Sequence, residues 1–303
     1  MARIFHRCKQ NPLLTAADLP FCAIAVLNPG AAEHDGQVVL LMRVEDAVGF
    51  SDIHVARSRN GVDGWEIEPE PLLKHGLEEW SYETWGCEDP RATWMEGEGC
   101  WYISYVAYSP MGPAVGFART KDFASVERVS LLGATNDKDG VLLGRKFGDD
   151  YCVLHRPDAG GHEHIWSAYS SDLIRWGDPH RVIREGFGPS WDAMKVGAGP
   201  PPIETDKGWL LIYHGVKGYA GHFVYRLGVA LLDKDAPHKV KALSRGCVFE
   251  PQAEYEVSGH TPNVVFPTGA LLRGDELWMY YGAADQRIAL ATAKLDDLMQ
   301  TLE

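Results

Sequence analysis

The sequence predicts an all-β fold, a five-bladed β-propeller, and three observations carry this prediction. Apolar runs of about four to eight residues, rich in Val, Ile, Tyr and Trp, alternate with turn residues along nearly the whole chain, which is the pattern of β-strands. The chain contains 32 Gly and 18 Pro among 303 residues, as expected for a fold with many turns. One order of strands and turns recurs five times, about every 50 to 70 residues, and such a repeat is typical of propeller blades.

Each predicted unit contains an aromatic-rich strand followed by a strand with small side chains. The aromatic strands read VVLLMRVED, WYISYVAYS, YCVLHRP, WLLIYHGV and LWMYYGAAD. The strands that follow read DIHVARS, AVGFART, HIWSAYS, YRLGVALL and RIALATA, and three of these lead into the similar turns SRNGVDGW, TKDFASVE and SSDLIRWG. A β-sandwich has no reason to repeat this order, so we expect one propeller domain over residues 1–303. The final residues, LDDLMQTLE, can form a short C-terminal helix.

Charge and cysteine content exclude several classes of protein. The formal net charge of −13 disfavours binding to nucleic acid and to acidic membrane surfaces. No segment approaches the length of an apolar membrane span, and MARIFHRCKQNP lacks the apolar core of a signal peptide. The six cysteines include no Cys-x-x-Cys pair, so we expect reduced thiols and a cytoplasmic location.

The predicted central channel is surrounded by polar residues. We place the five first strands at Asn28, Asp89, Asp139, Lys195 and Asn263, because the first strand of each blade lines the channel of a propeller. The starts of these strands and the ends of the strands that follow carry Arg43, Glu45, Glu88, Asp89, Arg91, Lys138, Asp139, His155, Arg156, Lys195, His214 and Asp285. Such charges either form a structural salt-bridge network or build a site. Their number favours a site.

An acidic motif, GCEDPR, opens the second unit. Pro90 restricts the backbone directly after Asp89. We expect Arg91 to keep Glu88 ionised while Asp89 faces the channel. There Asp89 can protonate the leaving oxygen of a glycosidic bond, as general acids of glycosidases do. The aromatic residues of WSYETW, just upstream, either stack on sugar rings or belong to the core.

A basic group comes from the third and fourth units. Arg156, Lys195 and His214, with Lys138 and Tyr225 as further members, can bind phosphate, or they can simply neutralise nearby carboxylates. One acid together with an oxyanion pocket points to phosphorolysis, in which inorganic phosphate replaces water as the nucleophile. An inverting hydrolase would need a second carboxylate as its base.

Several motifs resemble glycoside hydrolase family 130, which contains β-mannoside phosphorylases and related β-mannosidases. They are GCEDPR, LHRP, WDAMKVGAGPPPIETDKGWLLIYHGV, PNVVFPTGALL and YYGAAD, and the resemblance extends from about Asn28 to Ala293. It implies a five-bladed propeller that releases α-mannose 1-phosphate from β-linked manno-oligosaccharides or mannosyl disaccharides with inversion. It also implies that Asp89 is the proton donor and acts through a hydroxyl of the mannosyl residue. Phosphate is then the co-substrate, and we expect no cofactor.

The resemblance also assigns further site residues. The matches to the phosphate ligands are Arg156, Lys195, His214 and Tyr225, with Lys138 as an additional basic position. Arg43 and Asp285 match positions that contact the mannosyl ring, and the other candidates for substrate contact are Asn28, Glu88, Arg91, Asp139 and His155. The hydrolases of the family lack much of the basic set, so this chain favours a phosphorylase. A β-mannosidase and a non-catalytic glycan-binding propeller remain the alternatives, and the linkage, the acceptor sugar and homo-oligomer formation stay open.

The sequence gives no strong metal or nucleotide signature. His222 and the HEH segment His162–His164 lie in predicted loops without the helical spacing of paired zinc ligands, so we interpret them as surface histidines and expect no metal ion. The segment DKDG lacks the later carboxylates of a calcium loop. Neither a phosphate-binding loop nor a dinucleotide fingerprint occurs, so we expect no nucleotide cofactor.

Overall fold

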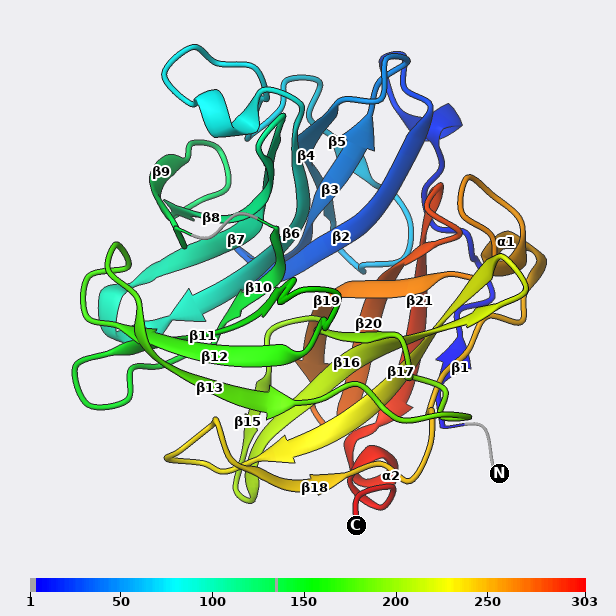
Figure 1. Ribbon diagram of the computed structural model, residues 1–303. Helices are drawn as coiled ribbons and strands as arrows, with labels where there is room; N and C mark the ends of the chain where they lie inside the picture. Colours follow the sequence, from blue (N-terminus) through cyan, green and yellow to red (C-terminus); the bar gives the residue numbers. More distant parts are fainter. Residues whose placement is uncertain (1–3, 134–135) are drawn as a thin grey trace.

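Strands and turns account for most of the protein in the computed structural model, which describes residues 4–133 and 136–303. The chain is therefore all-β, as predicted. Figure 1 shows that the sheets follow one another around the molecule in chain order, with the last sheet beside the first. Within the described residues the strands form four hydrogen-bonded sheets. The largest sheet contains two sets of four antiparallel strands, joined through one parallel pair, Ser51 with Gly86.

The strands therefore fall into five antiparallel sets, which we call units 1 to 5. Unit 1 contains β2 (Ala25–His34), β3 (Gln37–Glu45), β4 (Ser51–Ser58) and β5 (Glu66–Ile67). Unit 2 contains β6 (Gly86–Met95), β7 (Cys100–Ser109), β8 (Gly112–Thr120) and β9 (Glu127–Leu131). Unit 3 contains β10 (Asp137–Leu142), β11 (Tyr151–Pro157), β12 (Ile165–Ser170) and β13 (Gly177–Ile183). Unit 4 contains β14 (Lys195–Ala198), β15 (Ile203–Thr205), β16 (Gly208–Tyr219), β17 (His222–Leu232) and β18 (Val240–Leu243). The aromatic and small-residue strands expected from the sequence are confirmed.

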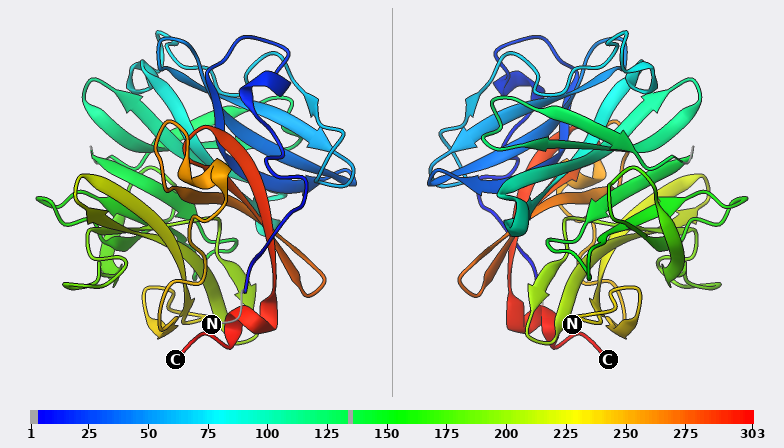
Figure 2. Two further views of the ribbon diagram at one scale, coloured as in Figure 1. Left: turned by 90° about the vertical axis from the view of Figure 1, so that its right-hand side faces the viewer. Right: turned by 90° about the vertical axis from the view of Figure 1, so that its left-hand side faces the viewer.

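Unit 5 brings the two ends of the chain together. Its strands are β19 (Val265–Arg273), β20 (Glu276–Ala283) and β21 (Arg287–Lys294), and β1 (His6–Arg7) from the N-terminal region pairs with β21. The Nε of Arg7 lies 2.7 Å from the Oε1 of Glu256, a fully buried carboxylate. Figure 2 shows both termini at the same end of the molecule. The strand pattern did not indicate β1, because two residues carry no periodicity.

The helices are short. They are α1 (Glu254–Val257), α2 (Leu295–Met299) and the 3-10 segments Ala16–Asp18, Ser81–Glu83 and Glu96–Glu98. Helix α2 confirms the expected C-terminal helix. No helix in the described parts of the chain is long and apolar enough to cross a membrane.

The apolar core lies between consecutive units rather than within one of them. Strand β3 shows why, since both of its faces are buried. Val39 and Leu41 pack with side chains of unit 2, whereas Leu40 and Met42 pack with Tyr280 and other residues of unit 5. Successive side chains of a strand point to opposite faces, so a strand covered on both sides reads as a continuous apolar run. Further clusters join units 2 and 3, units 3 and 4, and units 4 and 5.

One turn recurs after the third strands of units 1 to 3. The Oδ1 atoms of Asn60, Asp122 and Asp172 each accept backbone N–H groups two and three residues ahead. The next residue has a φ of 58° to 76° in all three turns. Glycine adopts this conformation readily in unit 1, whereas Phe123 and Leu173 occupy it in units 2 and 3. Both side chains are buried, so their burial offsets the backbone strain.

Candidate functional site

The first strands of the units meet near the middle of the molecule, where β2 contacts β19 and β6, and β10 contacts β6 and β14 (Figure 1). The register of β2, β6 and β10 with the following strand shifts at Asn28, Asp89 and Asp139. These residues have φ values of 43°, 49° and 54°. Asn and Asp tolerate this left-handed conformation better than most residues. A β-bulge of this kind interrupts the hydrogen-bond ladder between two strands and changes the direction of a side chain.

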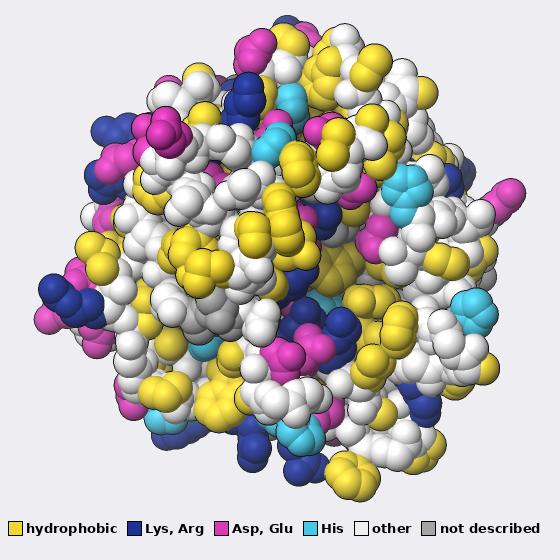
Figure 3. Space-filling model, turned by 45° about the horizontal axis from the view of Figure 1, so that its top comes forward, with side chains coloured by type: hydrophobic (Ala, Val, Ile, Leu, Met, Phe, Trp, Pro, Cys, Tyr) yellow, Lys and Arg dark blue, Asp and Glu magenta, His cyan; other side chains and the backbone are white. Residues whose placement is uncertain are grey.

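Asn28, Asp89 and Asp139 line one cavity of about 160 Å³. Its other lining residues are Arg43, Lys138, Arg156, Lys195, Tyr225, Phe266 and Asp285. A second cavity of about 250 Å³ shares Lys138, Arg156 and Lys195 with the first and is also lined by Pro113, Asn136, Asp158 and Glu163. Figure 3 shows a hollow in one face of the molecule, where basic and acidic side chains gather between apolar ones. Asp89 of the predicted acidic group therefore shares one cavity with four members of the predicted basic group, Lys138, Arg156, Lys195 and Tyr225.

Asp89 is buried and held by two donors. Its Oδ1 accepts hydrogen bonds from the Nδ2 of Asn28 at 2.8 Å and from a guanidinium nitrogen of Arg43 at 3.2 Å. Burial raises the pKa of the Asp89 carboxyl, but the charge of Arg43 and the hydrogen bond from Asn28 outweigh burial and lower it overall. These contacts favour the ionised carboxylate.

Glu88 pairs with cations that the sequence did not assign to it. Its Oε1 lies 3.0 Å from Arg43, and its Oε2 lies 4.0 Å from the Nζ of Lys138. Burial raises the pKa of Glu88, and the charge of Arg43 opposes this rise only in part. The expectation that Arg91 holds Glu88 ionised is wrong.

Arg91 instead connects unit 2 to units 3 and 4. It is fully buried and donates hydrogen bonds to the carbonyls of Gly199 at 2.8 Å and Ala198 at 3.1 Å. It also pairs with Asp139 at 3.1 Å. A buried guanidinium needs acceptors for its N–H groups, and Asp139 supplies them together with the carbonyls at the end of β14 and directly after it. Arg91 does not line the cavity.

Asp139 lies between two guanidinium groups. Its Oδ1 contacts Arg91, and its Oδ2 lies 2.8 Å from Arg156. Burial opposes its charge, but Arg156, His214 and Arg91 hold the pKa of Asp139 well below its usual range. Gly197 leaves room for this arrangement, because a Cβ at that position would overlap the Asp139 carboxylate and the His214 ring.

His214 lies behind Arg156 rather than in the cavity lining. It is fully buried, and its Nε2 accepts a hydrogen bond from Arg156 at 3.0 Å. Burial lowers the pKa of His214 to about 3, so the imidazole is neutral. The ring packs against Phe266, with ring centroids 4.6 Å apart. In this geometry His214 positions Arg156.

Arg156 and Lys195 form the basic wall of the cavity. The Nε of Arg156 lies 3.0 Å from the Oε2 of Glu163, and the Nζ of Lys195 lies 3.9 Å from its Oε1. Burial and the charge of Arg156 lower the pKa of Lys195. Burial raises the pKa of Tyr225 to about 12, so its hydroxyl keeps its proton and can donate. Two cations and a hydroxyl can hold a small anion.

Other predicted site residues are divided between the cavity and its surroundings. Asp285 lines the cavity, and burial raises its pKa. His155 lies outside the lining, where its Nδ1 is 2.7 Å from Asp137. Trp85 packs against Tyr108, with ring centroids 5.4 Å apart, and it does not line the cavity either.

Sequence reasoning missed two residues of this region, Phe266 and Glu163. Phe266 lies in β19, the first strand of unit 5, so the rule that first strands line the channel could have identified it. Glu163 lies in a loop before β12 and reaches the cavity through a β-bridge with Lys195. No local pattern predicts such a long-range bridge.

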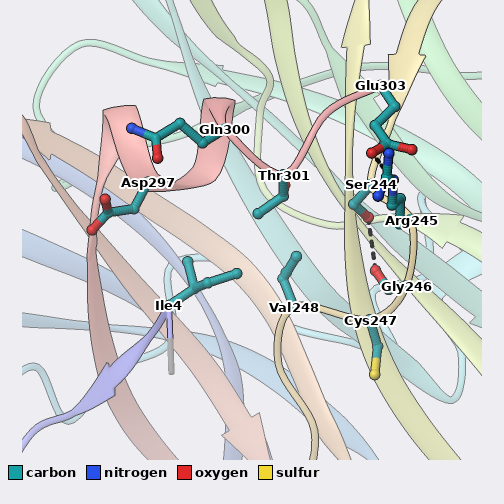
Figure 4. A pocket seen from close by; sticks show the side chains of 10 residues that line it. All are labelled: Ile4, Ser244, Arg245, Gly246, Cys247, Val248, Asp297, Gln300, Thr301 and Glu303. Carbon is teal, nitrogen blue, oxygen red and sulfur yellow. Dashed lines mark hydrogen bonds and ion pairs between the residues drawn. The ribbon is translucent and has the colours of Figure 1, made fainter. Parts of the chain in front are cut away.

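A larger cavity, of about 450 Å³, lies beside α2 and the segment after β18 (Figure 4). Arg245 and Glu303 pair with each other there. Figure 4 shows Asp297 on the other side, facing away from this pair. The described residues of its lining include no Lys or His. We therefore assign the candidate site to the smaller cavity, where acids and bases converge.

Comparison with known proteins identifies relatives along the whole chain. Residues 13–303 match the model of glycoside hydrolase family 130, described as beta-1,4-mannooligosaccharide phosphorylase. The chain is 31% identical to beta-1,4-mannooligosaccharide phosphorylase of Ruminococcus albus, over 98% of this chain and 90% of that protein. It is 30% identical to beta-1,2-mannobiose phosphorylase of Listeria innocua, over 98% of both. A solved structure of beta-1,2-mannobiose phosphorylase from Listeria innocua with beta-1,2-mannobiose superimposes with a TM-score of 0.89, covering 98% of each chain at 28% identity.

Proposed function

Because the chain belongs to glycoside hydrolase family 130, we propose that it catalyses phosphorolysis of β-mannosides with inversion at the anomeric carbon. One observation carries the proposal. Asp89 from β6, Arg156 from β11 and Lys195 from β14 line a single cavity. An acid and an anion site are thus close enough to act on one glycosidic bond. The relatives with assigned activities act on β-1,2- or β-1,4-linked mannosides, and the same substrate class is proposed here.

The reaction then proceeds as one displacement. Phosphate is held by Arg156 and Lys195, assisted by the Tyr225 hydroxyl and the Lys138 ammonium group. A phosphate oxygen attacks C1 of the mannosyl residue while the bond from C1 to the glycosidic oxygen breaks. The proton of Asp89 reaches the leaving oxygen through a hydroxyl of the mannosyl residue. The products are α-mannose 1-phosphate and the shortened sugar, and the reverse reaction uses the same groups.

The other cavity residues receive supporting roles. Arg43, Asn28 and Asp285 lie around Asp89, so they are proposed to bind the mannosyl ring. Arg91, Asp139 and His214 are proposed to act as positioning residues, since they fix Arg156 and the backbone of β14. Phosphate is the co-substrate, and no cofactor takes part in the proposed reaction.

Bound phosphate is also proposed to favour the protonated form of the Asp89 carboxyl. The contacts of Arg43 and Asn28 lower the pKa of the Asp89 carboxyl, which alone would make it a poor acid. A phosphate anion brings negative charge close to Asp89 and neutralises the nearby cations, and both effects raise a carboxyl pKa. Asp89 is therefore proposed to become an effective acid when the nucleophile is bound.

We also infer that units 1 to 5 are the blades of one five-bladed propeller domain. Core clusters join each unit to the next, and a further cluster joins unit 5 to unit 1. The pairing of β1 with β21 completes unit 5 with a strand from the other end of the chain.

A cytoplasmic location is proposed because all six cysteines are free, as in reducing compartments.

The test is cleavage of β-1,2- and β-1,4-mannobiose with and without inorganic phosphate, followed by proton and phosphorus NMR. The proposal predicts that cleavage requires phosphate and that α-mannose 1-phosphate forms in amounts equal to the released sugar. Release of free mannose at the same rate in phosphate-free buffer would overturn it. The variant Lys195→Met should raise the KM for phosphate more than the KM for mannobiose, since it removes a proposed phosphate contact.

A further inference from the structure

The two histidines of the HEH segment lie in the loop between β11 and β12 of unit 3. His162 and His164 precede β12, with Glu163 between them. Glu163 forms β-bridges with Asp158 and Lys195, so the segment is extended. In an extended segment the side chains of His162 and His164 share one side, whereas Glu163 points to the other. This explains why Glu163 contacts Arg156 and Lys195 while the two imidazoles do not.

The two imidazoles meet Glu185, a residue distant in sequence. The Nδ1 of His162 lies 3.0 Å from the Oε1 of Glu185, and the Nδ1 of His164 contacts the Oε2. One potential ligand atom from each of the three residues lies within 4.8 Å of the others. The Oε2 of Glu185 is buried, and the His164 imidazole is its only ion-pair partner among the described residues. A cation bound between the carboxylate and the two imidazole nitrogens would compensate the buried negative charge.

We propose that His162, His164 and Glu185 bind one divalent transition-metal ion, with Zn²⁺ as the preferred ion. Two imidazole nitrogens and one carboxylate are ligands that zinc accepts in a tetrahedral site. The His164 and Glu185 side chains are largely buried, whereas that of His162 is 68% exposed. The fourth position therefore faces solvent and takes a water molecule. Of the two histidines interpreted from the sequence as surface residues, His162 is exposed and His164 is buried.

The metal site has a structural consequence for the neighbouring cavity. The ion fixes both histidines that flank Glu163, and Glu163 contacts the two cations of the basic wall. Metal binding therefore holds the loop between β11 and β12 against β14. The site itself does not depend on the proposed phosphorolysis, because metal binding is measured without substrate.

The test is titration of the full chain with zinc chloride by calorimetry, in a buffer free of phosphate and chelators. Wild-type protein should bind one ion per chain, and zinc should raise its melting temperature. His164→Gln removes an imidazole ligand and Glu185→Gln removes the negative charge of the carboxylate, so each should weaken zinc affinity by about 100-fold. Both substitutions preserve side-chain size closely, and the melting temperature without zinc verifies that the variants fold.

The control is His180→Gln, which changes a different pair of neighbouring imidazoles. His180 stacks on His238 with ring centroids 4.2 Å apart, but this pair is outside the three-residue group. Zinc affinity should be unchanged in this variant. Absence of zinc binding to the wild type, or equal affinity in the wild type and the two ligand variants, would overturn the proposal.

Discussion

At the scale of single residues, two adjacent carboxyl groups differ in protonation behaviour although both are buried. Burial raises the pKa of Glu88 overall, whereas Arg43 and Asn28 reverse the effect of burial at Asp89. The difference follows from hydrogen bonding. Asn28 donates to Asp89, while Glu88 shares the charge of Arg43 with Asp89 and Glu45. Environments that separate the pKa values of neighbouring acids are a common way to give them different roles.

Asp89→Asn tests the role of this carboxyl in proton transfer. The substitution should lower kcat for phosphorolysis by about 1,000-fold, because general acid catalysis contributes rate factors of this order. Phosphate binding, measured by calorimetry, should be retained or become tighter, since a negative charge near the anion is lost. A kcat close to that of the wild type would contradict the assignment. Loss of phosphate binding in a folded variant would instead indicate a structural role.

His214 gives a prediction for stability against pH. Its pKa is about 3 in the folded protein and about 6.5 in an unfolded chain. The unfolded state therefore binds more protons between these values. The stability from neutral His214 is complete above about pH 6.5 and is lost as pH falls towards 3. From pH 6.5 to pH 5 this loss amounts to about 2 kcal/mol.

The measurement is urea denaturation of the wild type and His214→Gln at several pH values. The variant lacks the titrating imidazole, so its stability should fall less over this pH range. Parallel curves for the two proteins would show that His214 does not titrate as its burial requires. The charged and titratable groups that face His214, and that both proteins share, are Asp139, Arg156, Lys195, Arg91 and Tyr225.

At the level of secondary structure, the first strands of the units supply six of the ten residues that line the cavity. Their bulges at Asn28, Asp89 and Asp139 place three polar side chains in the cavity lining. Strand β14 contributes in another way, since Gly197 leaves space beside Asp139 and His214. The contacts of Asp139 and His214 therefore require a residue without a side chain at this position of β14.

Gly197→Ala tests this close approach. The added Cβ would overlap the Asp139 carboxylate and the His214 ring, so we expect a loss of about 2 kcal/mol in the free energy of unfolding. Phosphorolysis should fall as well, because Arg156 loses its fixed position. Gly177→Ala is the matched control. It lies in strand β13, and its Cβ would meet no atom within 4 Å. Equal losses of stability and of phosphorolysis in the two variants would show that the close approach at Gly197 is not the cause.

Local sequence patterns predict most of the strands but not the details of the site. Alternating and continuous apolar runs are local signals, so the second and third strands of all five units could be identified. The pairing of Arg91 with Asp139 arises from a contact between units 2 and 3. The same holds for the place of His214 behind Arg156. No window of neighbouring residues contains that information.

At the scale of the whole molecule, strand β1 joins the beginning of the chain to its last sheet. Arg7 anchors this strand through Glu256, which also accepts a hydrogen bond from Tyr281 at 2.7 Å. A buried carboxylate with these partners ties β1, α1 and β20 together. The sequence could not reveal this arrangement, because Arg7 and Glu256 are separated by almost the entire chain.

Arg7→Met tests the contribution of this link to stability. It leaves the Glu256 carboxylate buried without its cation, so the free energy of unfolding should fall by about 3 kcal/mol. Adding Glu256→Gln to this variant removes the buried charge and should restore part of the loss. Urea denaturation followed by tryptophan fluorescence measures both. If the double variant is no more stable than Arg7→Met, the buried charge is not the cause.

In the proposed reaction phosphate, and not water, attacks the anomeric carbon. Cleavage of β-mannobiose in water enriched in ¹⁸O, with unlabelled phosphate and mass spectrometry of the products, distinguishes the two nucleophiles. The account predicts mannose 1-phosphate without ¹⁸O, because its anomeric oxygen comes from the phosphate held by Arg156 and Lys195. Free mannose that carries ¹⁸O at C1, corrected for exchange of mannose with solvent, would contradict the account and identify water as the nucleophile.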